Sequence, residues 1–96
     1  MTKEDIKNIL RSKEGIVRKF KVRSISLFGS YVRNEQKADS DIDFLVDFED
    51  GATLFDLVNL QDVLLEIFKK KVSVVSKKGL NKYIGPYILK EAELIG

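Results

Sequence analysis

The stretch from Ser26 to Asp47 constrains the fold of this 96-residue chain more than any other. Just before and within its start, apolar Ile25 and Leu27 alternate with serines, which is the period of a half-buried strand. Gly29 then ends that strand, because glycine tolerates a tight turn and lets another group approach closely. Ser30 opens a short helical turn, and a polar loop over 34–40 leads to a second alternating run. The sequence therefore predicts a strand, a Gly-Ser turn, a short helix, a loop and a second strand.

Two aspartates, Asp41 and Asp43, lie in the second predicted strand. Residues two apart in a strand point to one face, with alpha carbons about 6.5–7 Å apart. Magnesium favours one or two carboxylates together with waters and substrate phosphates. Two such ions about 3.5–4 Å apart can clamp an in-line displacement at phosphorus. The pair is therefore a candidate metal site for phosphoryl or nucleotidyl chemistry.

The Gly29-Ser30 turn is a candidate phosphate site. The first amides of a helix lack internal partners and carry partial positive charge, which suits phosphate oxygens. Arg33 follows Ser30 by three residues, so it lies on the same side of the helical turn and could reach the same anion. A Gly-Ser turn or an Asp-x-Asp pair alone is common in loops and on solvated strands. Their combination at this spacing favours a metal-bound nucleoside triphosphate.

Composition excludes several classes of site. The chain has no cysteine and no histidine, which excludes disulfides, zinc knuckles, thiol nucleophiles, Ser-His triads and histidine–metal sites. Asp, Glu, Lys and Tyr remain for acid, base or metal chemistry. The formal net charge of +2 is too small to indicate a nucleic-acid-binding protein.

The distribution of apolar residues sets the class of protein. No apolar run approaches the ~18 residues that a membrane span needs, and charged residues interrupt the N-terminal segment at once. We therefore expect no membrane segment and no signal peptide, a cytoplasmic setting, and one domain over residues 1–96.

The second half of the chain predicts a helix from Leu54 to about Phe68, capped by Thr53. Its predicted core stripe is Leu54, Leu57, Val58, Leu64, Leu65 and Phe68. Three further apolar residues, Leu60, Val63 and Ile67, widen the apolar arc beyond the ~100° that one packed face needs. They predict either deeper burial or an interface with a partner or a second copy of the chain. A short strand over 71–76 and a last helix after Gly85-Pro86 follow.

The arrangement Gly29-Ser30, ten residues, Asp41-x-Asp43 resembles the signature of the DNA polymerase beta-like nucleotidyltransferase superfamily. Its surroundings, LFGSYVRNEQKADSDIDFLVDF, resemble the minimal nucleotidyltransferase branch, and the similarity extends to the closing ILKEAELI. The resemblance implies an α/β (α+β) fold, with a small mixed three-stranded sheet packed with helices. It also implies that Asp41 and Asp43 are catalytic and hold Mg²⁺, while Gly29, Ser30 and Arg33 bind ATP. The implied reaction is transfer of AMP to a hydroxyl of a HEPN-type toxin, which makes the chain an antitoxin.

Two positions depart from the family pattern. The family usually has glycine after the arginine, where this chain has Asn34, a residue that also tolerates left-handed backbone angles. The family's third carboxylate, on the third strand, is replaced by Ser73, which is neutral and a poor base. Loss of a general base costs about 10²–10⁴ in rate. A second interpretation is therefore a catalytically weak or inactive module that binds nucleotide and docks on its partner.

A third interpretation is the catalytic fragment of a drug- or tRNA-modifying transferase. It would need a second chain for its substrate domain, because 96 residues leave no room for one.

Overall fold

The computed structural model describes residues 1–95, and a mixed four-stranded sheet of order β3-β2-β1-β4 forms its centre. The strands are β1 (Val22–Phe28), β2 (Ile42–Phe48), β3 (Val72–Ser76) and β4 (Glu93–Leu94). The β1 strand pairs antiparallel with both β2 and β4, and β2 pairs parallel with β3. The predicted mixed α/β class is confirmed. The fourth strand, β4, was not predicted, because two residues are too few to establish an alternating pattern.

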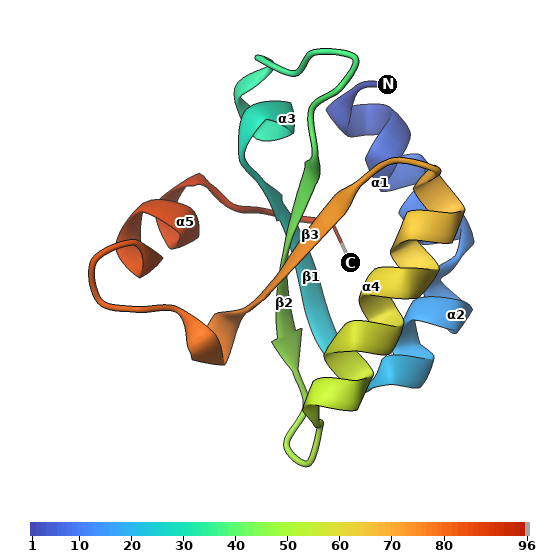
Figure 1. Cartoon of the computed structure of the whole chain (residues 1–96), viewed down its shortest axis with the longest axis vertical. Helices are drawn as coiled ribbons and strands as arrows, with labels where there is room; N and C mark the ends of the chain where they lie inside the picture. The colour runs from blue at the N-terminus through green and yellow to red at the C-terminus, as the bar shows by residue number, and fades with distance from the viewer. Residues whose placement is uncertain (96) are drawn as a thin grey trace.

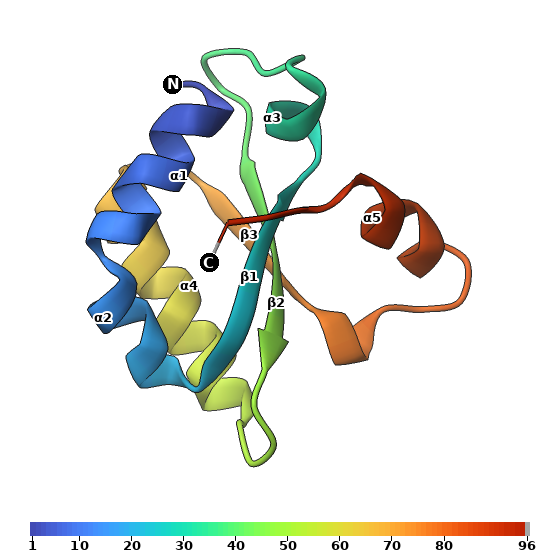
Figure 2. The same cartoon turned by 180° about the vertical axis from the view of Figure 1, so that it is seen from behind.

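Helices lie on both sides of this sheet. Three of them, α1 (Lys3–Ser12), α2 (Glu14–Val17) and α4 (Leu54–Phe68), cover one side, while α5 (Gly85–Glu91) lies on the other (Figure 1). The short α3 (Ser30–Arg33) follows directly from β1 at one end of the sheet. Seen from behind, the C-terminal segment crosses β1 on its way from α5 (Figure 2). Two 3₁₀ turns, η1 (Arg18–Phe20) and η2 (Lys77–Gly79), precede β1 and follow β3. No helix within residues 1–95 is both long enough and apolar enough to cross a membrane.

The two longest helices, α1 and α4, each begin after a threonine, and for α4 this is the predicted Thr53. Thr2 and Thr53 are N-caps in extended conformation, and each forms a capping box with the aspartate three residues later. The backbone N–H of Thr2 donates to Asp5 at 2.8 Å, and that of Thr53 donates to Asp56 at 2.9 Å. These bonds satisfy helix-terminal groups that would otherwise lack partners.

The hydrophobic core lies between the sheet and the three helices α1, α2 and α4. Alternate residues of β1 and β2, such as Ile25, Leu27, Ile42 and Phe44, point into it, together with Ile6 of α1. The other face of β2 carries Asp43 and Asp47. This alternation, which has the period of a strand, determines which side chains are left for a site.

The predicted core face of α4 is wrong in part. Leu60 and Leu64 are fully buried and Phe68 nearly so, but Leu54, Val58 and Leu65 are exposed. Of the two alternatives predicted for Leu60, Val63 and Ile67, deeper burial is observed at Leu60, which is 0% exposed, so the interface through all three residues is wrong. Val63 and Ile67 are half-buried. Apolar residues surround most of this helix, so the sequence alone does not determine which stripe faces the sheet.

Candidate active site

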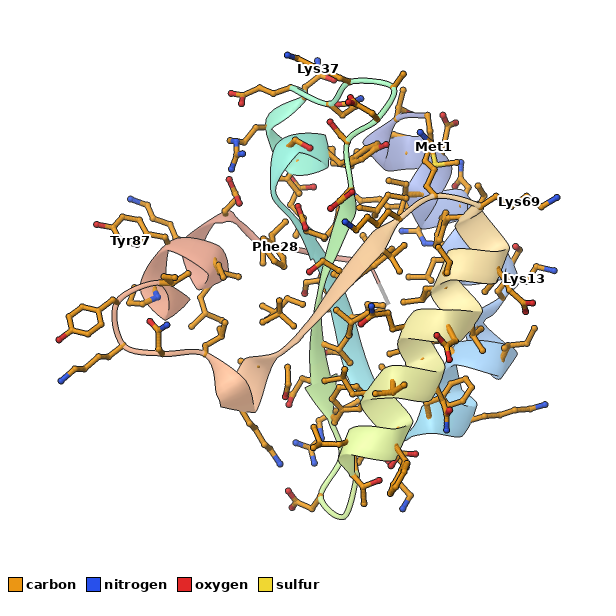
Figure 3. The ribbon with its side chains drawn as sticks, viewed as in Figure 1. Met1, Lys13, Phe28, Lys37, Lys69 and Tyr87 are labelled. Atoms are coloured by element: carbon orange, nitrogen blue, oxygen red, sulfur yellow. The ribbon has the colours of Figure 1, made fainter. Side chains whose placement is uncertain are left out.

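Asp43 lies at the beginning of β2, on the face of the sheet that α1, α2 and α4 leave uncovered. Strand pairing sets Phe28 of β1 opposite Asp43 on one side and Ser73 of β3 opposite it on the other. Phe28 lies on the α5 side of the sheet (Figure 3). Asp41 immediately precedes β2 and, like Asp43, is half-buried. The two predicted carboxylates are therefore close together at the end of β2.

Gly29 brings the predicted phosphate turn against this carboxylate pair. Its φ of 80° and ψ of −153° form a conformation that L side chains rarely adopt. A Cβ atom at this position would lie 2.2 Å from Oδ2 of Asp43. The Asp43 carboxylate therefore packs directly on the Gly29 Cα, and only glycine permits that approach.

The short helix α3 forms as predicted after this turn. The amides of Val32 and Arg33 donate to the Gly29 carbonyl at 3.1 and 3.2 Å. The helix ends at Asn34, which has a left-handed φ of 58°, as its replacement of the family's glycine predicts. Tyr31 is buried and anchors the turn on the core, while Ser30, the first residue of α3, is half-buried. Arg33 is exposed at the end of α3.

Glu91, the last residue of α5, joins this group and was not predicted from the sequence. Its Oε2 accepts a hydrogen bond from the Gly29 N–H at 2.8 Å, and its Oε1 pairs with Nη1 of Arg33. A second carboxylate, Glu35, accepts from Nε of Arg33 at 3.3 Å. Its place on a short helix near the end of the sequence gives no indication of a contact with Gly29, which lies 62 residues earlier in the chain.

Asp43 carries its negative charge at an electrostatic cost. Partial burial raises the pKa of its carboxyl above the ordinary value, and the nearby carboxylates of Asp41 and Glu91 raise it further. The guanidinium of Arg33 opposes this shift. A cation between Asp41 and Asp43 would relieve the cost. Within residues 1–95 no group of three or more His, Cys, Asp or Glu side chains is placed to hold a metal. A cation here would thus have two carboxylate ligands and need further oxygens from water or substrate.

Two serines complete the description of the site. Ser73 lies opposite Asp43 in the parallel register, so the position of the family's third carboxylate is next to Asp43 and is neutral here. Ser40 accepts a hydrogen bond from the Lys37 N–H at 2.8 Å, which makes it a turn serine of the loop before β2.

A separate pocket of about 370 Å³ lies beside α1, α2 and β1, on the helix-covered side of the sheet. Its walls are largely apolar, with Leu10, Val17 and Ile95 among them, and neither Asp41 nor Asp43 lines it. It lacks paired carboxylates and therefore offers no chemistry comparable to that at the end of β2.

Comparison with known proteins agrees with this geometry. A family model described as a nucleotidyltransferase domain matches residues 4–95. The chain belongs to the nucleotidyltransferase family. It is 40% identical over 92 residues to the protein adenylyltransferase MntA of Thermococcus cleftensis, and the match covers 95% of this chain and 93% of MntA. A solved structure described as a minimal nucleotidyltransferase superposes with a TM-score of 0.84 at 31% identity, over 97% and 95% of the two chains.

Two toxin–antitoxin complexes share the nucleotidyltransferase fold at lower identity. One contains AMP-PNP and matches with a TM-score of 0.72 and 22% identity, over 100% of this chain and 73% of that chain. The other contains a tri-AMPylated HEPN toxin of Shewanella oneidensis with its MNT antitoxin, with a TM-score of 0.68 and 19% identity, over 94% and 71%. At such identities these two matches establish the fold alone.

Proposed function

We propose that this nucleotidyltransferase, as a single minimal domain over residues 1–96, transfers AMP from Mg-ATP to a hydroxyl group of a partner protein. The observation that carries the proposal is the packing of the Gly29 turn on the Asp43 carboxylate. A turn with phosphate-binding amides and a carboxylate suited to Mg²⁺ are thereby in contact. The phosphates and the metal of one nucleotide could then be bound together.

The proposed site has two parts, a metal site and a phosphate site. Asp41 and Asp43 hold Mg²⁺, and Gly29, Ser30 and Arg33 hold the phosphates. The raised pKa of Asp43 supports this fit, because its causes, partial burial and then the nearby carboxylates of Asp41 and Glu91, disfavour a negative charge that a divalent cation would neutralise. Bound Mg²⁺ supplies charge neutralisation on the phosphates. The acceptor oxygen forms a bond to the α-phosphorus, the bond from that phosphorus to pyrophosphate breaks, and the hydroxyl proton is released.

The proposed partner is a HEPN-type toxin, and the proposed role is that of its antitoxin. The name of the Thermococcus cleftensis relative, protein adenylyltransferase, supports protein as the acceptor. The AMPylated HEPN toxin in the Shewanella complex supports this class of partner, and the AMP-PNP complex supports ATP as the donor. We propose a cytoplasmic reaction, where ATP is available.

One observation favours a second candidate function. Ser73 stands beside Asp43 at the third-carboxylate position and can neither activate the attacking hydroxyl nor hold a second metal strongly. A protein with this substitution could retain nucleotide binding and neutralise its partner by docking alone.

One experiment tests both candidates. The protein is incubated with Mg²⁺, α-labelled ATP and the HEPN-type product of the neighbouring gene. Label on the partner that disappears in Asp43→Ala and persists in Asp62→Ala, an exposed aspartate of α4, supports transfer. Full neutralisation of the partner without label, unaffected by Asp43→Ala, supports docking and contradicts the proposed transfer.

A further inference from the structure

The pairing of β4 with β1 determines the position of Glu91. In this antiparallel ladder Leu27 lies opposite Glu93 and Ser26 lies opposite Leu94. Continuing the same register by two residues along β1 brings Glu91 opposite Gly29. The hydrogen bond from the Gly29 N–H to Oε2 of Glu91, at 2.8 Å, extends the ladder with a side chain in place of a backbone carbonyl.

Both oxygens of Glu91 are engaged at the phosphate turn. Oε2 accepts from the N–H of Gly29, whose backbone conformation L side chains rarely adopt, and Oε1 pairs with Nη1 of Arg33. The Glu91 side chain is 23% exposed, whereas that of Glu35, the other partner of Arg33, is 65% exposed. Charge-assisted hydrogen bonds away from solvent are stronger than exposed ones, so Glu91 restrains Arg33 more than Glu35 does.

Glu91 approaches the turn from the opposite side to Asp43. Asp43 is on β2, which pairs along one edge of β1, while Glu91 shortly precedes β4, which pairs along the other edge. The hydrogen bonds from Arg33 to Glu91 and Glu35 use Nη1 and Nε, respectively. Glu91 thus holds the turn from the β4 edge of β1, and the Asp41–Asp43 pair lies at the β2 edge.

We propose that Glu91 is a positioning residue, which fixes the Gly29 turn and directs the Arg33 guanidinium toward the phosphates of the nucleotide. This inference rests on the proposed function. Glu91 is not a third metal ligand, since no group of three acidic residues within 1–95 is arranged to hold a metal. It is not a ready general base either, because both of its oxygens already accept hydrogen bonds.

The test compares Glu91→Gln with Glu35→Gln in the full chain. Glutamine keeps an acceptor for the Gly29 N–H but removes the ion pair with Arg33. Calorimetric titration is expected to show that Glu91→Gln binds Mg-ATP about tenfold more weakly than the wild type. This is the lower end of the roughly 10–100-fold losses in affinity found when the hydrogen-bond partners of metal ligands are removed. Glu35→Gln is expected to bind within about twofold of the wild type, because its pair is exposed. Thermal unfolding of both variants without nucleotide verifies that the titrated protein is folded.

A double-mutant cycle separates positioning from general stability. If Glu91 acts through Arg33, Glu91→Gln weakens Mg-ATP binding much less when Arg33→Ala is already present. Additive losses, unchanged binding or tighter binding in Glu91→Gln would each overturn the inference, and tighter binding would mean that Glu91 competes with the phosphates. If Glu91→Gln does not fold, Glu91→Asp, which is one methylene shorter, gives the same comparison. Failure of the wild type to bind Mg-ATP would instead overturn the proposed function.

Discussion

The Cα atom of Gly29 packs on the carboxylate of Asp43, so closely that a Cβ atom there would lie 2.2 Å from Oδ2. Gly51, in the turn after β2, also has a positive φ, 89° against 80° for Gly29, but nothing lies within 4 Å of its Cβ position. The two glycines therefore separate the effect of backbone strain from the effect of crowding the carboxylate.

Replacing Gly29 by alanine is expected to cost more than the same change at Gly51. Backbone strain alone costs about 1–2 kcal/mol, which is the loss expected for Gly51→Ala in urea unfolding. Gly29→Ala must also displace Asp43, so we expect a loss of about 3 kcal/mol or more. Mg-ATP binding, measured by calorimetry, is expected to disappear in Gly29→Ala and to survive in Gly51→Ala. Equal effects of the two changes on stability and binding would contradict this account.

The contact between Gly29 and Asp43 was predictable because its causes are local. A strand, a turn and a second strand follow one another within 22 residues, and antiparallel pairing of neighbouring strands brings the two motifs to one end of the sheet. Ser73 was predictable as the neighbour of Asp43 only through the family resemblance. Strand order and register between β2 and β3 do not follow from periodicity alone.

Glu91 and the rotation of α4 were not predictable for different reasons. Glu91 reaches Gly29 through a two-residue strand, and two residues carry no readable alternation. The α4 helix is apolar on most sides, so its orientation depends on the shape of the sheet beneath it. Long-range packing decides both, and a single sequence does not encode it in any local pattern.

The observed face of α4 predicts unequal costs for one substitution at two leucines. Leu60→Ala removes a side chain that is 0% exposed and should lower the free energy of unfolding by about 2–5 kcal/mol. Leu54→Ala removes one that is 77% exposed and should change it by about 0.5 kcal/mol or less. Urea unfolding followed by circular dichroism measures both. If Leu54→Ala instead lowered the free energy of unfolding more than Leu60→Ala, the core stripe predicted from the sequence would be the correct one.

Neutralising Asp43 is expected to stabilise the metal-free protein while abolishing activity. The pKa of Asp43 is raised in the folded state, so the folded protein binds this proton more readily than the unfolded chain. The resulting destabilisation is fully present above the folded pKa and fades as pH falls toward the ordinary value of about 4. Asp43→Asn should therefore raise the Tm at pH 7.5, by a few degrees at most because solvent screens the charge of this half-buried group.

Measuring the Tm of both proteins at lower pH checks whether ionised Asp43 destabilises the fold. The advantage of Asp43→Asn should shrink between pH 7.5 and about pH 4.5, as wild-type Asp43 takes up its proton. Added Mg²⁺ should raise the Tm of the wild type more than that of Asp43→Asn. A variant less stable than the wild type at pH 7.5, without metal, would show that Asp43 has favourable partners that outweigh its burial.

Restoring a carboxylate at Ser73 is expected to accelerate AMP transfer. Ser73 lies opposite Asp43 in adjacent parallel strands, which are about 4.8 Å apart, so an aspartate there adds a charge directly beside the proposed metal site. A base or metal ligand supplied at this position should raise the rate of labelling of the partner at least about tenfold, which is part of the 10²–10⁴ that a well-placed general base contributes. Without metal, Ser73→Asp should lower the Tm, since it places one more negative charge near Asp41 and Asp43. Ser73→Asn, similar in shape but neutral, should change neither the rate nor the Tm in this way. If Ser73→Asp leaves the rate of an active wild type unchanged, another group already activates the acceptor, and the missing third carboxylate does not limit the reaction.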